Sequence, residues 1–230
     1  MKKQEHSSLY KALGIVGVLL AAVLIPFFLA HPARHYADPL ERALSLYQKG
    51  DYKQAATYFR QADSMGSPDA AFALGAMSFA GKGTAVNIPE ALIYYEKAAK
   101  TGYAPAQTTL ALIYVHGQNV AQDLEKGLDY AKQAAENGDV EAQMMLARWF
   151  ETGENVDQDV EEAVKYYKMA AEAGSIDAKT ALTLIYKNGA GNVSANEFSM
   201  RRWQNKIMRQ KRFENIFQNL PPDHIEKIQP

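Results

Sequence analysis

Two consecutive stretches of 36 residues decide the fold: APAQTTLALIYVHGQNVAQDLEKGLDYAKQAAENGD over residues 104–139 and VEAQMMLARWFETGENVDQDVEEAVKYYKMAAEAGS over residues 140–175. The same residue types return at this step on both sides of the pair. The series are Leu74, Leu110, Leu146, Leu182; Ala70, Ala106, Ala142, Ala178; Tyr58, Tyr94, Tyr130, Tyr166; Gly66, Gly102, Gly138, Gly174; and Gly81, Gly117, Gly153, Gly189. A fixed period of this length is typical of a solenoid of helical hairpins.

One repeat, from Val140 to Ser175, predicts two short antiparallel helices. Its first half carries an amphipathic stripe of Ala142, Leu146, Trp149 and Phe150. Gly153 then ends the first helix, and Asp159 stands where an N-cap is needed for the second. The second helix, to about Glu172, buries Ala163, Tyr166, Tyr167, Ala170 and Ala171. Such a hairpin cannot bury its apolar faces alone, so each copy needs neighbours.

The repeats set the organisation of the chain. An atypical leading hairpin occupies residues 39–67, four repeats follow at 68–103, 104–139, 140–175 and 176–212, and a helix end and tail occupy 213–230. The fourth repeat has one extra residue, which places Trp203 at the position of Tyr166 and Asn196 at the capping position of Asp159. The pattern predicts an all-α, right-handed α-solenoid of about four and a half repeats, preceded by one transmembrane helix.

The recurring positions resemble the Sel-1-like repeat, a relative of the tetratricopeptide repeat. One copy presents Ala106, Leu110, Ala111, Tyr114, Gly117, Val120, Asp123, Lys126, Gly127, Tyr130, Ala134 and Gly138. The first copy departs from the pattern, with Ser78 in place of the aromatic residue and Asn87 in place of the aspartate. The resemblance covers roughly residues 39–212 and implies an adaptor or scaffold without shared catalytic residues.

The N-terminal segment lies outside the repeats. From Ala12 to Ala30, 19 residues carry no charge, a length that as a helix spans roughly 28 Å of the ~30 Å bilayer core. Lys2, Lys3 and Lys11 precede it, which favours residues 1–11 in the cytoplasm, a transmembrane helix at 12–30, a linker at 31–38 and periplasmic repeats. A cleaved signal peptide is the main alternative and a buried soluble helix the other; the length of the apolar run and the poor cleavage site favour the anchor.

Composition excludes several classes of function. Between Pro68 and Ser175 there are 16 acidic and 8 basic residues, whereas Glu197 to Arg212 holds 6 basic residues and one acid. An acidic body argues against nucleic acid as a partner. The chain has no cysteine, which excludes disulfides, thiolate chemistry and cysteine-ligated zinc.

No pattern predicts an enzyme, a cofactor or a metal. None of the five histidines has a histidine or carboxylate at a credible metal-binding spacing, and His116 is expected at an exposed helix end. Pairs such as Glu161 and Glu162 stand at the start of second helices, where capping and the helix dipole explain them. A glycan hydrolase would need two acids converging in a cleft, and the sequence predicts none.

Variable positions on the first helices are the first candidate site. They are spaced i, i+4, i+7: Phe72, Ala76, Phe79; Thr108, Leu112, Val115; Met144, Arg148, Glu151; and Thr180, Leu184, Lys187. First helices line the concave side of related solenoids, so these residues predict a groove for a peptide of a protein partner. The alternative is that Phe72 and Phe79 pack against the leading hairpin.

A basic C-terminal segment is the second candidate site. It contains Arg201, Arg202, Lys206, Arg209, Lys211 and Arg212. These residues are either a solvated cap of the last hairpin or a contact for anionic lipid or an acidic partner. Together the features predict a single-pass inner-membrane scaffold or assembly subunit that binds envelope proteins. A quality-control adaptor that presents clients to a membrane enzyme is the alternative.

Overall fold

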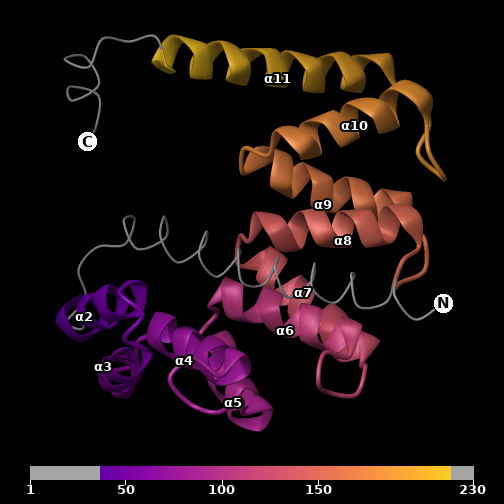
Figure 1. Ribbon diagram of the computed structural model, residues 1–230. Coiled ribbons are helices and arrows are strands. Elements are labelled where there is room, and N and C mark those ends of the chain that lie inside the picture. Colours follow the sequence, from indigo (N-terminus) through magenta and orange to yellow (C-terminus); the bar gives the residue numbers. More distant parts are fainter. Residues whose placement is uncertain (1–36, 219–230) are drawn as a thin grey trace, which may run out of the picture. The chain divides into compact units, whose positions relative to one another are not determined.

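The computed structural model describes residues 37–218, and the all-α prediction is confirmed there. The ten helices of this range are α2 Ala37–Gln48, α3 Tyr52–Ser64, α4 Pro68–Ala80, α5 Ile88–Ala99, α6 Ala104–His116, α7 Leu124–Glu136, α8 Val140–Thr152, α9 Val160–Glu172, α10 Ile176–Asn188 and α11 Glu197–Gln218. The same residues contain no strand, and Ala190 and Val193 form one isolated bridge. Successive helices pair into hairpins (Figure 1).

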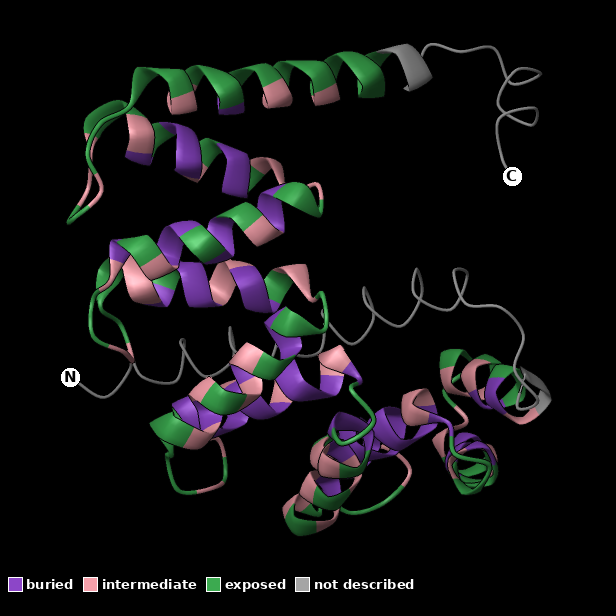
Figure 2. Ribbon diagram, turned by 180° about the vertical axis from the view of Figure 1, so that it is seen from behind, coloured by how far each residue is buried: buried purple, intermediate pink, exposed green. Residues whose placement is uncertain are grey.

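The chain divides between Ala98 and Ala99 into two compact units. The N-terminal unit contains α2–α5, and the C-terminal unit contains α6–α11 (Figure 1). In both, second helices such as α3 and α7 have a buried stripe with exposed residues on the other side, which is the amphipathic pattern that the period predicts (Figure 2). The first helices α4 and α6 differ, because almost all of their residues are buried or half-buried.

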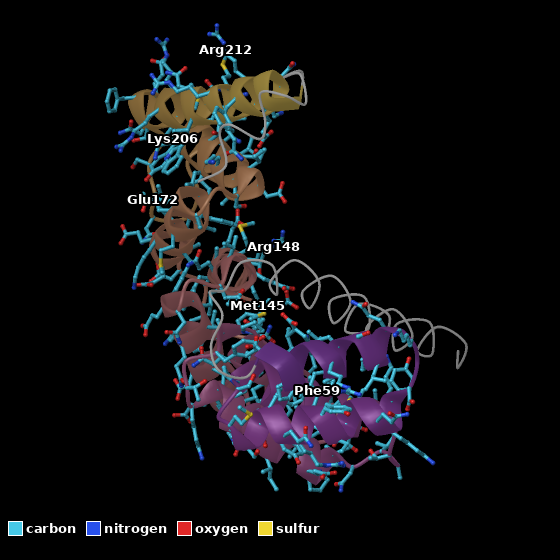
Figure 3. The ribbon with its side chains drawn as sticks, turned by 90° about the vertical axis from the view of Figure 1, so that its left-hand side faces the viewer. Phe59, Met145, Arg148, Glu172, Lys206 and Arg212 are labelled. Atoms are coloured by element: carbon cyan, nitrogen blue, oxygen red, sulfur yellow. The ribbon has the colours of Figure 1, made fainter. Side chains whose placement is uncertain are left out.

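In the N-terminal unit the core lies between the two hairpins. Phe59 of α3, labelled in Figure 3, is 1% exposed and packs in one cluster with Leu74 of α4. Gly75 of α4 lets the ring of Tyr95 approach, since a Cβ at Gly75 would lie 2.7 Å from a carbon of that ring. Tyr95 is consequently buried, and this burial raises the pKa of its phenol.

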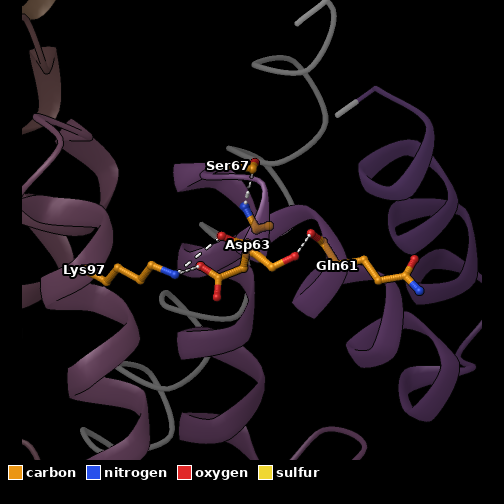
Figure 4. Close-up of polar contacts among 6 residues, drawn as sticks. Gln61, Asp63, Ser67 and Lys97 are labelled. Atoms are coloured by element: carbon orange, nitrogen blue, oxygen red, sulfur yellow. Dashed lines mark hydrogen bonds and ion pairs between the residues drawn. The ribbon is translucent and has the colours of Figure 1, made fainter. Parts of the chain in front are cut away.

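Polar contacts join α3 to α5 at one end of this unit. The Lys97 Nζ donates to the Asp63 carboxylate at 2.5 Å and to the Asp63 carbonyl at 3.4 Å (Figure 4). Nearby, the buried Ser67 Oγ accepts from the Ala70 backbone N–H at 3.2 Å and caps α4 (Figure 4). The cap satisfies one of the free amides at the start of that helix.

In the C-terminal unit the period of 36 residues becomes a repeated core. Leu110, Leu146 and Leu182 occupy the same place in α6, α8 and α10, and each is fully buried. Burial of a leucine stabilises a fold by about 1.5–3 kcal/mol. The core continues through α11, where Trp203 is 5% exposed.

The turns inside these hairpins have the predicted geometry. Gly117 and Gly153 end α6 and α8 in the left-handed conformation, with φ of 61° and 77°. Asp123 and Asp159 then cap α7 and α9; the Asp123 carboxylate accepts from the Lys126 N–H at 2.9 Å. The expected cap of the fourth repeat is also confirmed, since the Asn196 Oδ1 accepts from the Ser199 N–H at 2.8 Å.

The two ends of the chain differ in how far the structure describes them. The expected transmembrane helix at residues 12–30, its flanks and most of the tail lie outside the described residues. Among residues 37–218 no helix combines the length and apolar character that a membrane crossing requires. α11 continues past Arg212, the expected end of the fourth repeat, to Gln218.

Candidate protein-binding surface

The structure places the predicted groove residues at very different depths. Phe72 and Ala76 of α4 and Thr108 and Val115 of α6 are buried; Phe79, Leu112, Met144 and Glu151 are half-buried; and Arg148 is exposed. Thr180, Leu184 and Lys187 of α10 are exposed. The α4 residues belong to the N-terminal unit and the others to the C-terminal unit. The binding role of these twelve residues stays a prediction, but the four buried side chains do not reach the surface.

Packing inside each hairpin explains the buried members. The Phe72 ring lies 5.6 Å, centroid to centroid, from that of Tyr95 in α5. Val115 packs against Gly127 of α7, where a Cβ would lie only 2.5 Å from the Val115 Cγ2. Phe72 and Val115 therefore hold first helices to second helices and cannot contact a partner without unpacking. A serine at Val115 would test stability rather than binding.

Four side chains of the C-terminal unit remain as a coherent candidate. Leu112, Arg148 and Leu184 occupy the same repeat position in α6, α8 and α10, and Met145 lies next to Arg148 on α8. Leu184 is 52% exposed. We call these four residues the first-helix surface. Figure 3 shows Met145 and Arg148 on one side of this unit and Glu172 of α9 on the other.

Met145 lies outside the i, i+4, i+7 spacing that predicts the groove. It is half-buried, and its equivalents in the neighbouring repeats are Thr109 and Ala181. The sequence does single out this position, because a large methionine stands where the neighbouring repeats have the small residues Thr109 and Ala181. Met side chains adapt to irregular partners, so Met145 adds contact area to the surface.

Glu151 is held by an internal contact. The Tyr167 hydroxyl of α9 donates to the Glu151 Oε2 at 2.5 Å. Burial, followed by this hydrogen bond, raises the pKa of the Tyr167 phenol. The bond ties α8 to α9, and Arg148 is left as the charged group that projects from the centre of the first-helix surface.

The basic segment lies on α11 and is mostly open to solvent. Arg201, Arg202, Arg209, Lys211 and Arg212 are exposed, and Lys206 is half-buried. The Arg201 guanidinium donates to the Glu197 carboxylate at 2.5 Å. The Lys206 Nζ lies 4.2 Å above the Trp203 ring. Lys206 thus belongs to the packing of the last hairpin, whereas the arginines face outward.

A shallow pocket of about 290 Å³ lies beside α7. It is lined by Ala99, Lys100, Lys126, Asp129, Tyr130 and Gln133. The Lys126 Nζ lies 4.1 Å above the ring of Tyr114 and donates to its hydroxyl at 2.7 Å. The Tyr114 ring stacks on that of Tyr130, with centroids 6.0 Å apart. These contacts hold the lysine in the hairpin, and the lining does not pair a nucleophile with a base.

The acidic side chains and the histidine of the described residues are not arranged as a metal site. Residues 37–218 contain no group of three or more His, Cys, Asp or Glu side chains placed to hold a metal ion. His116 is exposed at the end of α6.

Comparison with known proteins identifies the repeats. A model of the Sel1 repeat matches residues 42–67, 68–103, 104–139 and 140–175, more than half of the chain. The protein belongs to the Sel1-repeat family. Sel1-repeat proteins are generally protein–protein interaction scaffolds, and their repeats are typically non-catalytic. No protein of curated function matches the chain.

Solved structures share the fold. A Sel1 repeat protein from Oxalobacter formigenes is 26% identical, with 90% of this chain and 83% of that one covered and a TM-score of 0.63. A protective antigen of uropathogenic Escherichia coli strains with an SLR fold is 29% identical, with a TM-score of 0.64. That match covers 76% of this Sel1-repeat chain but 38% of the antigen, so this chain spans well under half of the antigen's length.

Proposed function

We propose that this Sel1-repeat protein is a membrane-anchored scaffold that binds an envelope protein through its first-helix surface. Residues 12–30 would hold it in the inner membrane, with the N-terminus in the cytoplasm and the repeats in the periplasm. The uncharged run of 19 residues and the preceding lysines support the anchor and its orientation. In this function the protein is an assembly subunit that brings its partner to the membrane.

One observation carries the binding role. Three successive first helices present Leu112, Arg148 and Leu184 at the same repeat position, half-buried or exposed. The leucines two residues earlier in each helix, Leu110, Leu146 and Leu182, are fully buried. An arginine flanked by apolar side chains is a composition that protein interfaces favour. A partner segment with apolar side chains on either side of a carboxylate would complement it.

A substitution on this surface tests the binding role. In the full chain, Leu112→Ser with Leu184→Ser should lower recovery of the partner from detergent-extracted membranes by about tenfold, because two apolar contacts are lost. Glu136→Ser with Lys168→Ser, at exposed positions of α7 and α9, is the matched control and should leave recovery unchanged. Equal recovery with both double variants would exclude the first-helix surface as the binding site.

The anchor is tested separately. Extraction of native membranes with alkaline carbonate should leave the full chain in the pellet, and deletion of residues 1–36 should release it. A periplasm-active reporter fused after Pro230 should be active. Release of the full chain by carbonate, or an inactive reporter, would refute the anchor or its orientation without bearing on the first-helix surface.

A further inference from the structure

One exposed face of α11 combines large apolar side chains with arginines. We call it the outer face of α11 and define it by Phe198, Arg201, Arg202, Met208, Arg209 and Arg212. Phe198 is 79% exposed and Met208 67% exposed, which is unusual for such large apolar side chains. Four arginines surround them.

Helical spacing places these residues together. Phe198, Arg202 and Arg209 recur at intervals of four and seven residues, so they form one row along the helix. Arg201, Met208 and Arg212 recur at seven and four and form the adjoining row. Trp203 points the other way, into the core with α10. Figure 3 shows Lys206 on the side of α11 toward α10 and Arg212 on the side away from it.

The charge of this helix contrasts with that of the helices before it. α11 contains six basic and two acidic residues, whereas residues 104–175 contain 13 acidic and 5 basic residues. A positive face at the end of an acidic body favours a negatively charged partner and disfavours a basic one.

The residue types indicate a protein as that partner. Protein interfaces are enriched in arginine, phenylalanine and methionine and depleted in lysine. The outer face of α11 has this composition, and the lysines of the helix lie off it. The guanidinium group can bind a carboxylate through two parallel hydrogen bonds, which gives direction as well as charge.

Two other occupants fit less well. A helix that lies in a membrane surface needs a continuous apolar face, but the continuous apolar side of α11 is covered by α10, and Phe198 and Met208 stand among arginines. A second copy could offer the acidic outer sides of α7 and α9. Exposed residues of these helices supply carboxylates, from Glu125, Asp129, Glu136, Glu161 and Glu172. Their one exposed large apolar side chain is Leu124 at the start of α7, which could not cover both Phe198 and Met208.

We propose that the outer face of α11 binds an acidic amphipathic helix of a partner protein. Carboxylates of that helix bind Arg202 and Arg209, and its apolar side chains cover Phe198 and Met208. The inference rests on the proposed function in taking a protein as the partner, but it uses a surface separate from the first-helix surface.

The test uses a fluorescent synthetic helix with glutamates and leucines at helical spacing, titrated with the full chain in a non-ionic detergent. Arg202→Glu with Arg209→Glu should weaken binding about tenfold or more, because two carboxylate contacts become repulsive. Lys165→Glu with Lys168→Glu makes the same change of charge on the outer side of α9 and should alter binding by about twofold or less.

Phe198→Ser with Met208→Ser should weaken binding even in high salt, where screening removes most of the charge effect.

All six substituted side chains are exposed, and circular dichroism verifies that each variant stays helical. Equal losses in the two charge-reversal variants would overturn the inference, because net charge alone would then explain binding. Binding to phosphatidylglycerol vesicles that exceeds binding to the peptide would also overturn it, as would self-association that Arg202→Glu with Arg209→Glu abolishes. Leu112→Ser with Leu184→Ser should leave binding of the peptide unchanged, because these residues lie outside the outer face of α11. A failure of the proposed function can therefore be distinguished from a failure of this inference.

Discussion

Lys179 of α10 occupies the position that Gln143 holds one repeat earlier in α8. The Gln143 Nε2 donates to the Ala135 carbonyl at 2.9 Å, and Gln107 makes the equivalent bond to Ala99 at 3.0 Å. Lys179 is equally buried, at 6% exposure, and donates to the Gly174 carbonyl at 3.2 Å and to the Gln210 side chain. Between the third and fourth repeats, a charged side chain thus replaces the neutral glutamine that donates to a backbone carbonyl in the two earlier repeats.

Lys179→Gln should stabilise the protein. Burial and then the charge of Lys206 lower the pKa of the Lys179 ammonium, while Glu214 raises it. The neutral amide avoids this unfavourable burial, and we expect the free energy of unfolding at pH 7 to rise by roughly 1 kcal/mol. Urea denaturation of the C-terminal unit's helices measures it. Lys187→Gln, at an exposed site on α10, should change stability by less than about 0.5 kcal/mol.

The same site predicts a dependence on pH. Because the pKa of Lys179 is lower in the folded state than its ordinary value of 10.5, the unfolded chain binds more protons in the window just below 10.5. The contribution of this site to the free energy of unfolding therefore increases as pH rises through that window, because the Lys179 ammonium loses its charge. Below the window the cost of burying the charged ammonium stays constant. The advantage of Lys179→Gln should shrink between pH 7 and about pH 10. An advantage that stays constant or grows would contradict a buried charged lysine.

Gly127 and Val115 form a pair whose volumes are matched. The equivalents of Gly127 in the adjacent repeats are Ala91 and Ala163, yet Val115 fills the space that a Cβ would need. Gly127→Ala should destabilise the protein by about 1 kcal/mol, since overpacking costs about 1–3 kcal/mol and helix propensity returns about 1 kcal/mol.

A double-mutant cycle tests this explanation. In Val115→Ala with Gly127→Ala the removed methyl groups make room for the new one, so the two changes together should cost about 1–2 kcal/mol less than their sum. Thermal or urea unfolding of the four proteins of the cycle measures the coupling. Additive effects would show that Val115 and Gly127 do not compete for one space.

Asn119 lies in a backbone conformation that few residues adopt. Its φ is 61°, and the equivalent positions of the other hairpin loops, Gly83, Asn155 and Gly191, also have positive φ. Asn119→Val should destabilise the protein by about 1–2 kcal/mol, because a branched side chain is strained there. Asn119→Gly should stay within about 0.5 kcal/mol of the wild type. Equal stabilities of the two variants would mean that the loop relaxes to another conformation.

Much of this fold could be predicted from the period of 36 residues, because caps and core positions recur with it. Asp159 and Asn196 cap helices as expected, and Asn87 caps α5 as the aspartate would, with its Oδ1 accepting from the Glu90 N–H at 3.2 Å. The candidate groove was harder to predict from the sequence. Spacing shows which residues share one side of a helix, but it does not show how the helix is rotated about its axis relative to the helix that it packs against. In the structure this rotation buries Phe72 and Val115.

The end of the repeat array is capped by polar residues on α11. In α9, Val160, Val164, Tyr167 and Ala171 are buried, and Val160 lies close to Gly191 of the following repeat. The equivalent residues of α11 are Glu197, Arg201, Gln204 and Met208, and all are exposed. The first three of these residues are polar, and Met208 is apolar. Polar outer faces are what terminal repeats of a solenoid require for solubility.

Substituting residues of α11 by their equivalents in α9 should make the end of the repeat array self-associate. The full chain with Glu197→Val, Arg201→Val and Gln204→Tyr exposes an apolar surface of the kind that a further repeat would cover. We expect self-association that increases with concentration in size-exclusion chromatography with light scattering, whereas the wild type keeps its mass. Glu161→Val, Lys165→Val and Lys168→Tyr on α9 are the matched control, on a side where no repeat packs. If the α11 variant keeps the mass of the wild type at all concentrations, polarity at these three positions does not terminate the array.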